Sequence, residues 1–128
     1  MSNNKKIGKS GERIAKWYFK NRGYQILETN YHTRQGEIDI ICKKDMELVF
    51  VEVKTRTSTS FGYPEQAINE QKQKHLAEAI EKFVSEYQGQ IELIRIDAIC
   101  IQLNSHGKAS IKHFENIIQD TNHNDFEN

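Results

Sequence analysis

The stretch from residue 36 to residue 54 reads GEIDIICKKDMELVFVEVK and contains two apolar segments separated by a short polar break. The second segment is dense in β-branched and aromatic residues, which favour strands, and the first is rich in isoleucine. We therefore expect two strands, over residues 37–43 and 48–54. A loop of about four residues, Lys44 to Glu47, is expected to join them as an antiparallel hairpin.

Each of these expected strands carries an acidic residue within an otherwise apolar segment. In the register of that hairpin, Asp39 lies opposite Glu52 with the Cβ atoms about 5 Å apart, and Glu37 lies opposite Lys54. Side chains alternate along a strand, so Glu52 and Lys54 share one face about 6.6 Å apart. Facing carboxylates repel each other, and a half-buried pair requires that one carboxyl be protonated or that a cation lie between them.

A divalent cation satisfies this pair most simply. Hard cations take oxygen ligands, and Mg²⁺ binds through one or two carboxylates together with water and a substrate phosphate. Lys54 is placed to orient or deprotonate an attacking water, or to neutralise a phosphoryl oxygen. The pattern therefore predicts a metal-dependent phosphodiester site, and ordinary ion pairs at the strand ends are the alternative interpretation.

The sequence before the hairpin predicts a helix. Apolar residues recur at three- and four-residue steps over residues 8–22, and Gly23 is suited to close this helix in a left-handed conformation. Residues 24–27 form a short apolar stretch. Residues 28–36 are polar, and we expect a loop there.

The sequence after the hairpin alternates loop, helix and strand. Residues 55–62 are rich in Ser, Thr and Gly and predict a loop, and Pro64 suits the first turn of a helix that ends near Gly89. Residues 91–103 predict a strand, and residues 109–118 predict either a fourth strand or a short helix. This order indicates an α/β fold with a mixed sheet covered by helices.

The composition is that of one folded domain. The chain has 128 residues, of which 37% are hydrophobic, and this content is sufficient for one core. We expect a single domain over residues 1–118 and a disordered polar tail over residues 119–128. The longest apolar runs have four residues, and the start lacks the apolar segment of a secretory signal. We therefore expect a cytoplasmic protein without a membrane segment, in which Cys42 and Cys100 are buried thiols.

The charges cancel in sum but are unevenly distributed. The chain has 18 basic and 18 acidic residues, yet residues 1–35 contain eight basic and two acidic residues, a local charge of +6. A basic amino-terminal third is able to hold phosphates at its surface although the total charge is zero. A solvated helix face is the alternative explanation.

Several ordered motifs add a resemblance to these patterns. Asp39 followed by Glu52-Val53-Lys54 resembles the PD-(D/E)xK motif of the restriction-endonuclease-like superfamily, with Ile38 at the position of the proline. Over residues 7–103 the chain is similar to the bacterial YraN family, small proteins related to archaeal-type Holliday-junction resolvases. The similar motifs are Gly11-Glu12, Gly23-Tyr24-Gln25-Ile26-Leu27, Asn30-Tyr31, Gly36-Glu37-Ile38-Asp39-Ile40-Ile41, Leu48-Val49-Phe50-Val51-Glu52-Val53-Lys54-Thr55-Arg56 and Phe61-Gly62 with Pro64.

The resemblance implies the restriction-endonuclease-like fold, an α/β/α sandwich with a central mixed β-sheet. It implies Asp39 and Glu52 as ligands of Mg²⁺ or Mn²⁺, the Val53 carbonyl as a further ligand, and Lys54 as the residue that orients water. In resolvases a glutamate of the first helix joins the site, and Glu12 matches that position. The implied substrate is DNA, branched or otherwise structured.

Other charged residues are weaker candidates. Arg34 and Arg56 flank the predicted metal site and are candidate phosphate ligands, with ordinary surface charge as an equal alternative. We expect Lys72 and Lys74 of the second helix to be solvated.

Asp97 and the histidines rank lower still. Asp97 follows Arg95 at a spacing of two and is either part of an ion pair near the site or an edge-strand charge. The histidines lack the spacing of metal ligands and are assigned no role. They are His32, His75, His106, His113 and His123.

Together these patterns favour a Mg²⁺-dependent endonuclease acting on DNA, in which water attacks the phosphorus in line. Two other classes stay open: a nucleic-acid-binding or partner-binding module with the same fold but no turnover, and a structural protein without affinity for nucleic acid. Symmetric cleavage of two strands needs a second subunit, so a homodimer is among the expected assemblies.

Overall fold

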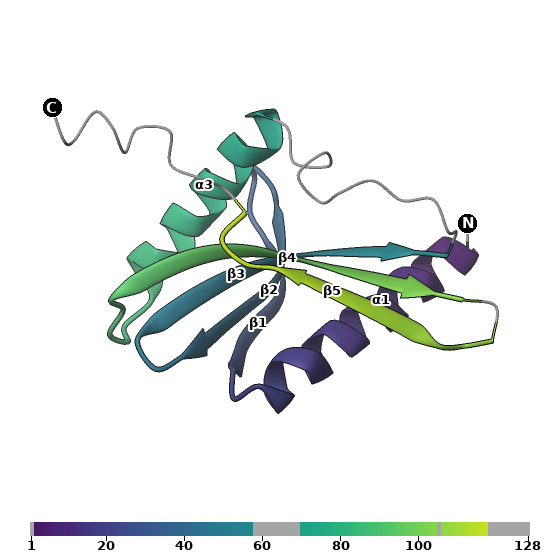
Figure 1. Cartoon of the computed structure of the whole chain (residues 1–128). Helices are drawn as coiled ribbons and strands as arrows, with labels where there is room; N and C mark the ends of the chain where they lie inside the picture. Colours follow the sequence, from purple (N-terminus) through teal and green to yellow (C-terminus); the bar gives the residue numbers. More distant parts are fainter. Residues whose placement is uncertain (1, 58–69, 105, 118–128) are drawn as a thin grey trace, which may run out of the picture.

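The computed structural model describes residues 2–57, 70–104 and 106–117, with the backbone alone for residues 2–7. This part of the chain forms two helices and five strands, whose arrangement is drawn in Figure 1. Their bounds are α1 Ser2–Asn21, β1 Gln25–His32, β2 Glu37–Lys44, β3 Glu47–Arg56, α3 Glu70–Glu86, β4 Leu93–Leu103 and β5 Ala109–Phe114.

The described strands form one mixed sheet in the order β1-β2-β3-β4-β5. β1 with β2, β2 with β3, and β4 with β5 are antiparallel, whereas β3 and β4 are parallel. A parallel pair needs a crossover connection, and α3 lies within the one between β3 and β4. The mixed sheet predicted from the order of elements is therefore confirmed.

The two helices cover opposite faces of this sheet (Figure 1). α1 packs Ala15 and Phe19 against the face that includes Val51. α3 packs Leu76 against the other face, which includes Phe50. Adjacent residues of β3 point to opposite sides of the sheet, and both sides are apolar along most of this strand. The three layers form the predicted restriction-endonuclease-like α/β/α sandwich.

α1 is longer than the apolar pattern indicated, because it starts at Ser2 rather than near residue 8. Its first residues are mostly polar and add no apolar stripe, so periodicity does not reveal them. The end agrees with the prediction. Gly23 has a φ of +87° and donates its N–H to the Lys20 carbonyl at 3.1 Å, while the Tyr24 N–H donates to the Phe19 carbonyl at 3.0 Å. These are the two bonds of a Schellman cap.

The loop expected over residues 28–36 is wrong in its first half, because β1 extends from Gln25 to His32. β1 is an edge strand of the described sheet and exposes every second side chain, so its sequence lacks the apolar density of β2 and β3. Its pairing with β2 shifts register between Ile26 and Glu28. Asn30 has a φ of +52°, a left-handed conformation that asparagine tolerates better than most residues.

The structure differs from the sequence prediction at the turn between β2 and β3 and at the end of β3. The turn between β2 and β3 is shorter than four residues, because β2 ends at Lys44 and β3 starts at Glu47. β3 continues to Arg56, into the expected loop. The segment 109–118 contains strand β5 rather than a helix. Pro64 and the tail 119–128 lie outside the described residues.

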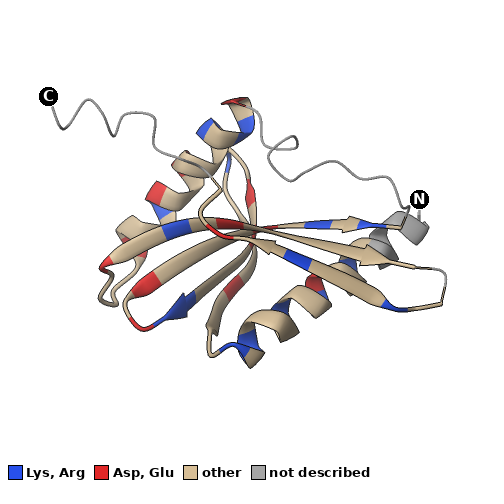
Figure 2. Ribbon diagram, in the orientation of Figure 1, with Lys and Arg blue, Asp and Glu red and all other residues tan. Residues whose placement is uncertain are grey.

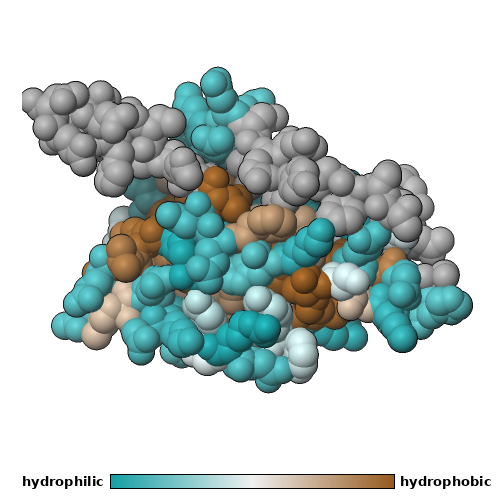
Figure 3. Space-filling model, viewed as in Figure 1, coloured by the Kyte–Doolittle hydropathy of each residue, from teal (hydrophilic) through white to brown (hydrophobic). Residues whose placement is uncertain are grey.

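The two thiols agree with expectation. Cys42 and Cys100 are both buried, and neither is part of a disulfide. None of the helices in the described ranges has both the length and the apolar character needed to cross a membrane. Figure 3 shows hydrophilic residues over most of the side in view, with hydrophobic residues in separate patches.

Candidate functional site

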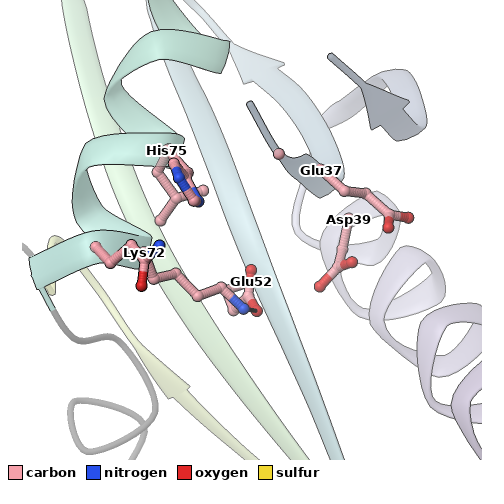
Figure 4. A pocket seen from close by; sticks show the side chains of 8 residues that line it. Glu37, Asp39, Glu52, Lys72 and His75 are labelled. Atoms are coloured by element: carbon pink, nitrogen blue, oxygen red, sulfur yellow. Dashed lines mark hydrogen bonds and ion pairs between the residues drawn. The ribbon is translucent and has the colours of Figure 1, made fainter. Parts of the chain in front are cut away.

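A pocket of about 430 Å³ lies between β2, β3 and α3. Figure 4 shows Glu37 and Asp39 on one side of it, and Lys72 and His75 projecting from α3 towards Glu52 on the other. The described residues that line it are Gly36, Glu37, Asp39, Glu52, Gln71, Lys72, His75 and Leu76. Both acids of the predicted metal pair therefore line one pocket.

The strand register explains how these two acids meet. β2 and β3 pair in the expected register as far as Ile40 and Val51, and Asp39 and Glu52 are the next positions along it. The described pairing ends there. Instead, the Asp39 carboxylate accepts a hydrogen bond of 2.8 Å from the Val53 N–H. The Asp39 side chain thus bonds to β3 at the point where the two strands separate.

Glu52 is the most buried acid of the pocket, with 5% of its surface exposed. Its Oε1 atom lies 3.6 Å from the Lys54 ammonium and accepts a short hydrogen bond from the Lys72 ammonium. Glu37 pairs in the ladder with His32 of β1, and the two side chains approach to 3.7 Å. The expected alignment of Glu37 with Lys54 lies beyond the described pairing of β2 and β3.

Asp39 is the acid whose titration is most strongly perturbed by the pocket. Burial, and after it the negative charge of Glu52, raise the pKa of Asp39 to about 7, although the hydrogen bond from Val53 acts in the opposite direction. Each cause follows from the fold, since the register brings two acids into one partly buried space. Strongly perturbed carboxyls of this kind are concentrated at functional sites.

The donor atoms suit a hard divalent cation with few protein ligands. Asp39 and Glu52 supply carboxylate oxygens, of which one Asp39 oxygen already accepts the hydrogen bond from the Val53 N–H. Within the described ranges, no three or more His, Cys, Asp or Glu side chains are grouped so that they could hold a metal ion. Mg²⁺ does not need such a group, because water and substrate phosphate complete its shell. The Val53 carbonyl as a ligand stays a prediction.

Glu12 is placed next to this site but not in it. α1 lies on the face of the sheet opposite α3, and Glu12 does not line the pocket. Its Oε1 atom accepts a hydrogen bond of 2.6 Å from the Asn30 side chain. Asn30 lies between the paired positions that flank Asp39 in the β1–β2 ladder. Glu12 therefore contacts the β1 residue that lies across from Asp39 in the ladder, on the neighbouring strand.

Neither predicted phosphate-binding arginine lines the pocket. Arg34 is exposed in the turn before β2, two residues from the pocket residue Gly36. Arg56 is at the end of β3, and its Nε atom is buried without a hydrogen-bond partner in the described structure. It lines a small cavity with Cys100 and Lys112 instead.

The sequence interpretation missed the helix side of the pocket. Lys72, expected to be solvated, bonds to Glu52 and has only 34% of its side chain exposed, whereas Lys74 is exposed as expected. His75 was assigned no role but lines the pocket, and a methyl group at Gly36 would come within 3.2 Å of its Cβ atom. The available signal was helical spacing, since the pocket residues of α3 lie on the side of the buried Leu76.

Asp97 belongs to a separate polar cluster on the α1 side of the sheet. It is fully buried in β4, which pairs with a strand on each side, so Asp97 is not an edge-strand charge. Asp97 also does not line the pocket. Arg95 donates to it at 2.8 Å and His113 approaches it at 2.7 Å. Burial would raise the pKa of Asp97, but hydrogen bonds from His113, Arg95 and the Asn116 N–H outweigh burial and lower it. His113, assigned no role from the sequence, is thus a hydrogen-bond partner of the buried Asp97 carboxylate.

Comparison with known proteins identifies relatives of similar length. The model of the Uncharacterised protein family UPF0102 matches residues 11–101. A UPF0102 protein of Syntrophomonas wolfei is 42% identical over 113 residues, which cover 88% of this chain and 97% of that protein. One of Alkaliphilus oremlandii is 46% identical over 115 residues, with the same coverage. One of Caldicellulosiruptor bescii is 41% identical over 119 residues, covering 92% of this chain and 98% of the relative.

Proposed function

This chain belongs to the UPF0102 family, also called the YraN family, and we propose that it is a divalent-metal-dependent endonuclease acting on DNA. The observation that carries the proposal is the convergence of Asp39 and Glu52 on one pocket, with Lys54 beside Glu52. The two carboxylates are suitable ligands for Mg²⁺ or Mn²⁺, and the lysine ammonium is suited to the negative charge of a phosphodiester. Branched DNA is the substrate we infer within this class, from the resemblance to junction resolvases.

Each residue has a separate task in this proposal. Asp39 and Glu52 would hold the divalent cation, which would supply positive charge to the scissile phosphate and lower the pKa of an attacking water. Asp39 must be ionised to do so, and a cation between the two acids would relieve the repulsion from Glu52 that, after burial, raises the pKa of Asp39. Lys54 orients the water for in-line attack on phosphorus. Glu52 is buried within the pocket, so its charge is screened less than that of an exposed acid.

A row of basic residues along α1 supports a polyanionic partner (Figure 2). Lys9, Arg13, Lys16 and Lys20 recur at four-, three- and four-residue steps, so they share one side of the helix. This row, the α1 basic stripe, lies on the side away from Ala15 and Phe19 in the core. It concentrates positive charge in a chain that is neutral in total.

The decisive experiment measures metal-dependent cleavage by D39N and E52Q. Both changes remove a carboxylate charge and keep the side-chain shape, so we expect folded proteins that lose Mg²⁺-dependent cleavage by about 100-fold or more. The substrates are a linear duplex, a flap and a four-way junction. D45N and E92Q are matched controls, because both acids are exposed outside the pocket. Variants D39N and E52Q that cut as fast as the parent would remove the basis of the proposal.

A binding module without turnover is the second candidate, and one contact favours it. Glu52 already has Lys54 and Lys72 beside it, so its charge is balanced without a metal. This candidate predicts DNA binding that weakens with salt, is unaffected by Mg²⁺, and produces no nicks with any divalent metal. A homodimer is part of the endonuclease proposal where both strands are cut, and light scattering of the DNA-bound protein tests it.

A further inference from the structure

The pocket holds two cationic side chains where two acids would bind a divalent cation. Lys54 and Lys72 approach the same atom, Oε1 of Glu52. A divalent ion between Asp39 and Glu52 would lie within several ångströms of both ammonium groups. Repulsion at that range is strong in a partly buried space. At least one ammonium group therefore has to move when the ion binds.

The contacts identify Lys72 as the group that moves. Lys72 hydrogen bonds to Oε1 and so takes up the position that a ligand bond from this oxygen would need. Lys54, at 3.6 Å, forms an ion pair beyond hydrogen-bond distance and leaves that position open. Lys54 also stands on the same strand as Glu52, whereas Lys72 reaches the carboxylate from α3 (Figure 4). A lysine has a flexible four-carbon stem, so its ammonium can shift several ångströms while the helix stays in place.

The released ammonium would remain at the pocket. Lys72 belongs to the wall opposite the acids, and 34% of its side chain is exposed to solvent. A phosphate bound together with a cation on Asp39 and Glu52 would therefore occupy the pocket that Lys72 lines. An ammonium beside it is positioned to neutralise phosphate charge.

We propose that Lys72 is a displaceable counter-ion of this pocket, which neutralises Glu52 in the metal-free protein, yields that carboxylate to the divalent cation, and then binds the phosphate of the nucleic acid. The inference rests on the proposed function and adds a phosphate-binding residue to it. It also gives metal and phosphate a reciprocal coupling, because each favours the position of Lys72 that the other requires. Metal alone binds weakly, and metal with substrate binds tightly.

Calorimetric titration of the full chain with Mn²⁺ tests the first half of the proposal. K72M removes the charge but retains an unbranched side chain, and we expect it to bind Mn²⁺ about tenfold more tightly than the parent. K72R keeps the charge and should bind as weakly as the parent. K74M is the matched control, because Lys74 is exposed on the same helix, and its affinity should equal that of the parent.

Single-turnover cleavage at saturating Mn²⁺ tests the second half. K72M should cleave more slowly than the parent by about tenfold or more, since the phosphate has lost its counter-charge, although its metal affinity is higher. A residue that only supports the fold would not raise metal affinity while lowering rate. Thermal melts establish that the variants are folded, and K72Q replaces K72M under the same criteria if K72M is not.

The outcomes separate this inference from the proposed function. Mn²⁺ binding by K72M that equals or falls below that of the parent overturns the inference. If the parent then still cleaves and D39N does not, the endonuclease proposal stands without it. If neither the parent nor any Lys72 variant binds Mn²⁺, both proposals fail.

Discussion

Asp39 links the pocket to the stability of the whole protein. In an unfolded chain an aspartate has a pKa of about 3.9, whereas the pKa of Asp39 in the folded protein is raised to about 7. The folded state therefore binds this proton more tightly than the unfolded state. The contribution of Asp39 to stability is fully present below about pH 4 and is lost as the pH rises through 7.

We expect this loss to be visible in denaturant unfolding between pH 4 and pH 8. A difference of about three pKa units corresponds to at most about 4 kcal/mol for this group, with other groups adding their own slopes. In D39N the neutral amide keeps an acceptor for the Val53 N–H, so the variant should be more stable than the parent at pH 8 and similar to it at pH 4. D45N, an exposed control, should follow the parent. A D39N profile as steep as the parent profile would contradict the assignment.

The same residues show what sequence could and could not predict about the site. Asp39 and Glu52 interrupt apolar strands, and strand pairing has a fixed register, so their approach was predictable from spacing. Helical spacing could place Lys72 on the inward side of α3, but not its contact with Glu52, because this partner is on a different element and no local pattern states where α3 lies on the sheet. The same holds for His113 and Asp97, which meet only when β5 pairs with β4.

At the scale of elements, strands were predictable in proportion to their burial. β3 is apolar on both faces and the sequence predicts its position closely, whereas residues 28–32 of the edge strand β1 fall in a predicted loop because the outward residues are polar. Its distortion at Asn30 has a further consequence. This residue lies between the two β1 positions that pair with the neighbours of Asp39, and it bonds to Glu12, so the irregular part of β1 is also a part that contacts α1.

The contact of α1 with the sheet depends on one small residue. Gly11 is buried against Thr55 of β3, and a methyl group there would overlap the threonine side chain. We expect G11A to destabilise the protein by about 1–3 kcal/mol, the usual cost of overpacking, despite the higher helix propensity of alanine. The same change three residues earlier has no such contact, since a methyl group at Gly8 meets nothing within 4 Å.

This pair of glycines provides its own control. G8A should stabilise the protein by up to about 1 kcal/mol through helix propensity alone. Urea denaturation of the two variants therefore should give changes of opposite sign. If G11A were as stable as G8A, α1 would not be held to β3 through Gly11, and the placement of Glu12 beside Asn30 would lose its support.

At the scale of the whole molecule, two features proposed to meet DNA belong to opposite faces of the sheet. The pocket lies on the α3 side, and the α1 basic stripe is on the outer surface of the other layer. The sequence predicted both features, but not this separation, which arises because α1 and α3 pack on different faces of one sheet (Figure 1). DNA is stiff over tens of base pairs, so one straight duplex at the pocket does not also follow the stripe.

A branched DNA can satisfy this arrangement, because its arms leave the junction in different directions. We therefore expect neutralisation of the stripe by K9Q with K20Q to weaken binding of a four-way junction by about tenfold at low salt and to reduce the salt dependence by about two ions, while linear duplex binding changes by less than about twofold. K74Q with K82Q removes the same charge from exposed positions of α3 and serves as the control. Fluorescence anisotropy over a salt series measures the binding of each double variant to the four-way junction and to the linear duplex. Equal losses for junction and duplex would assign the stripe to general attraction and leave branched DNA without structural support.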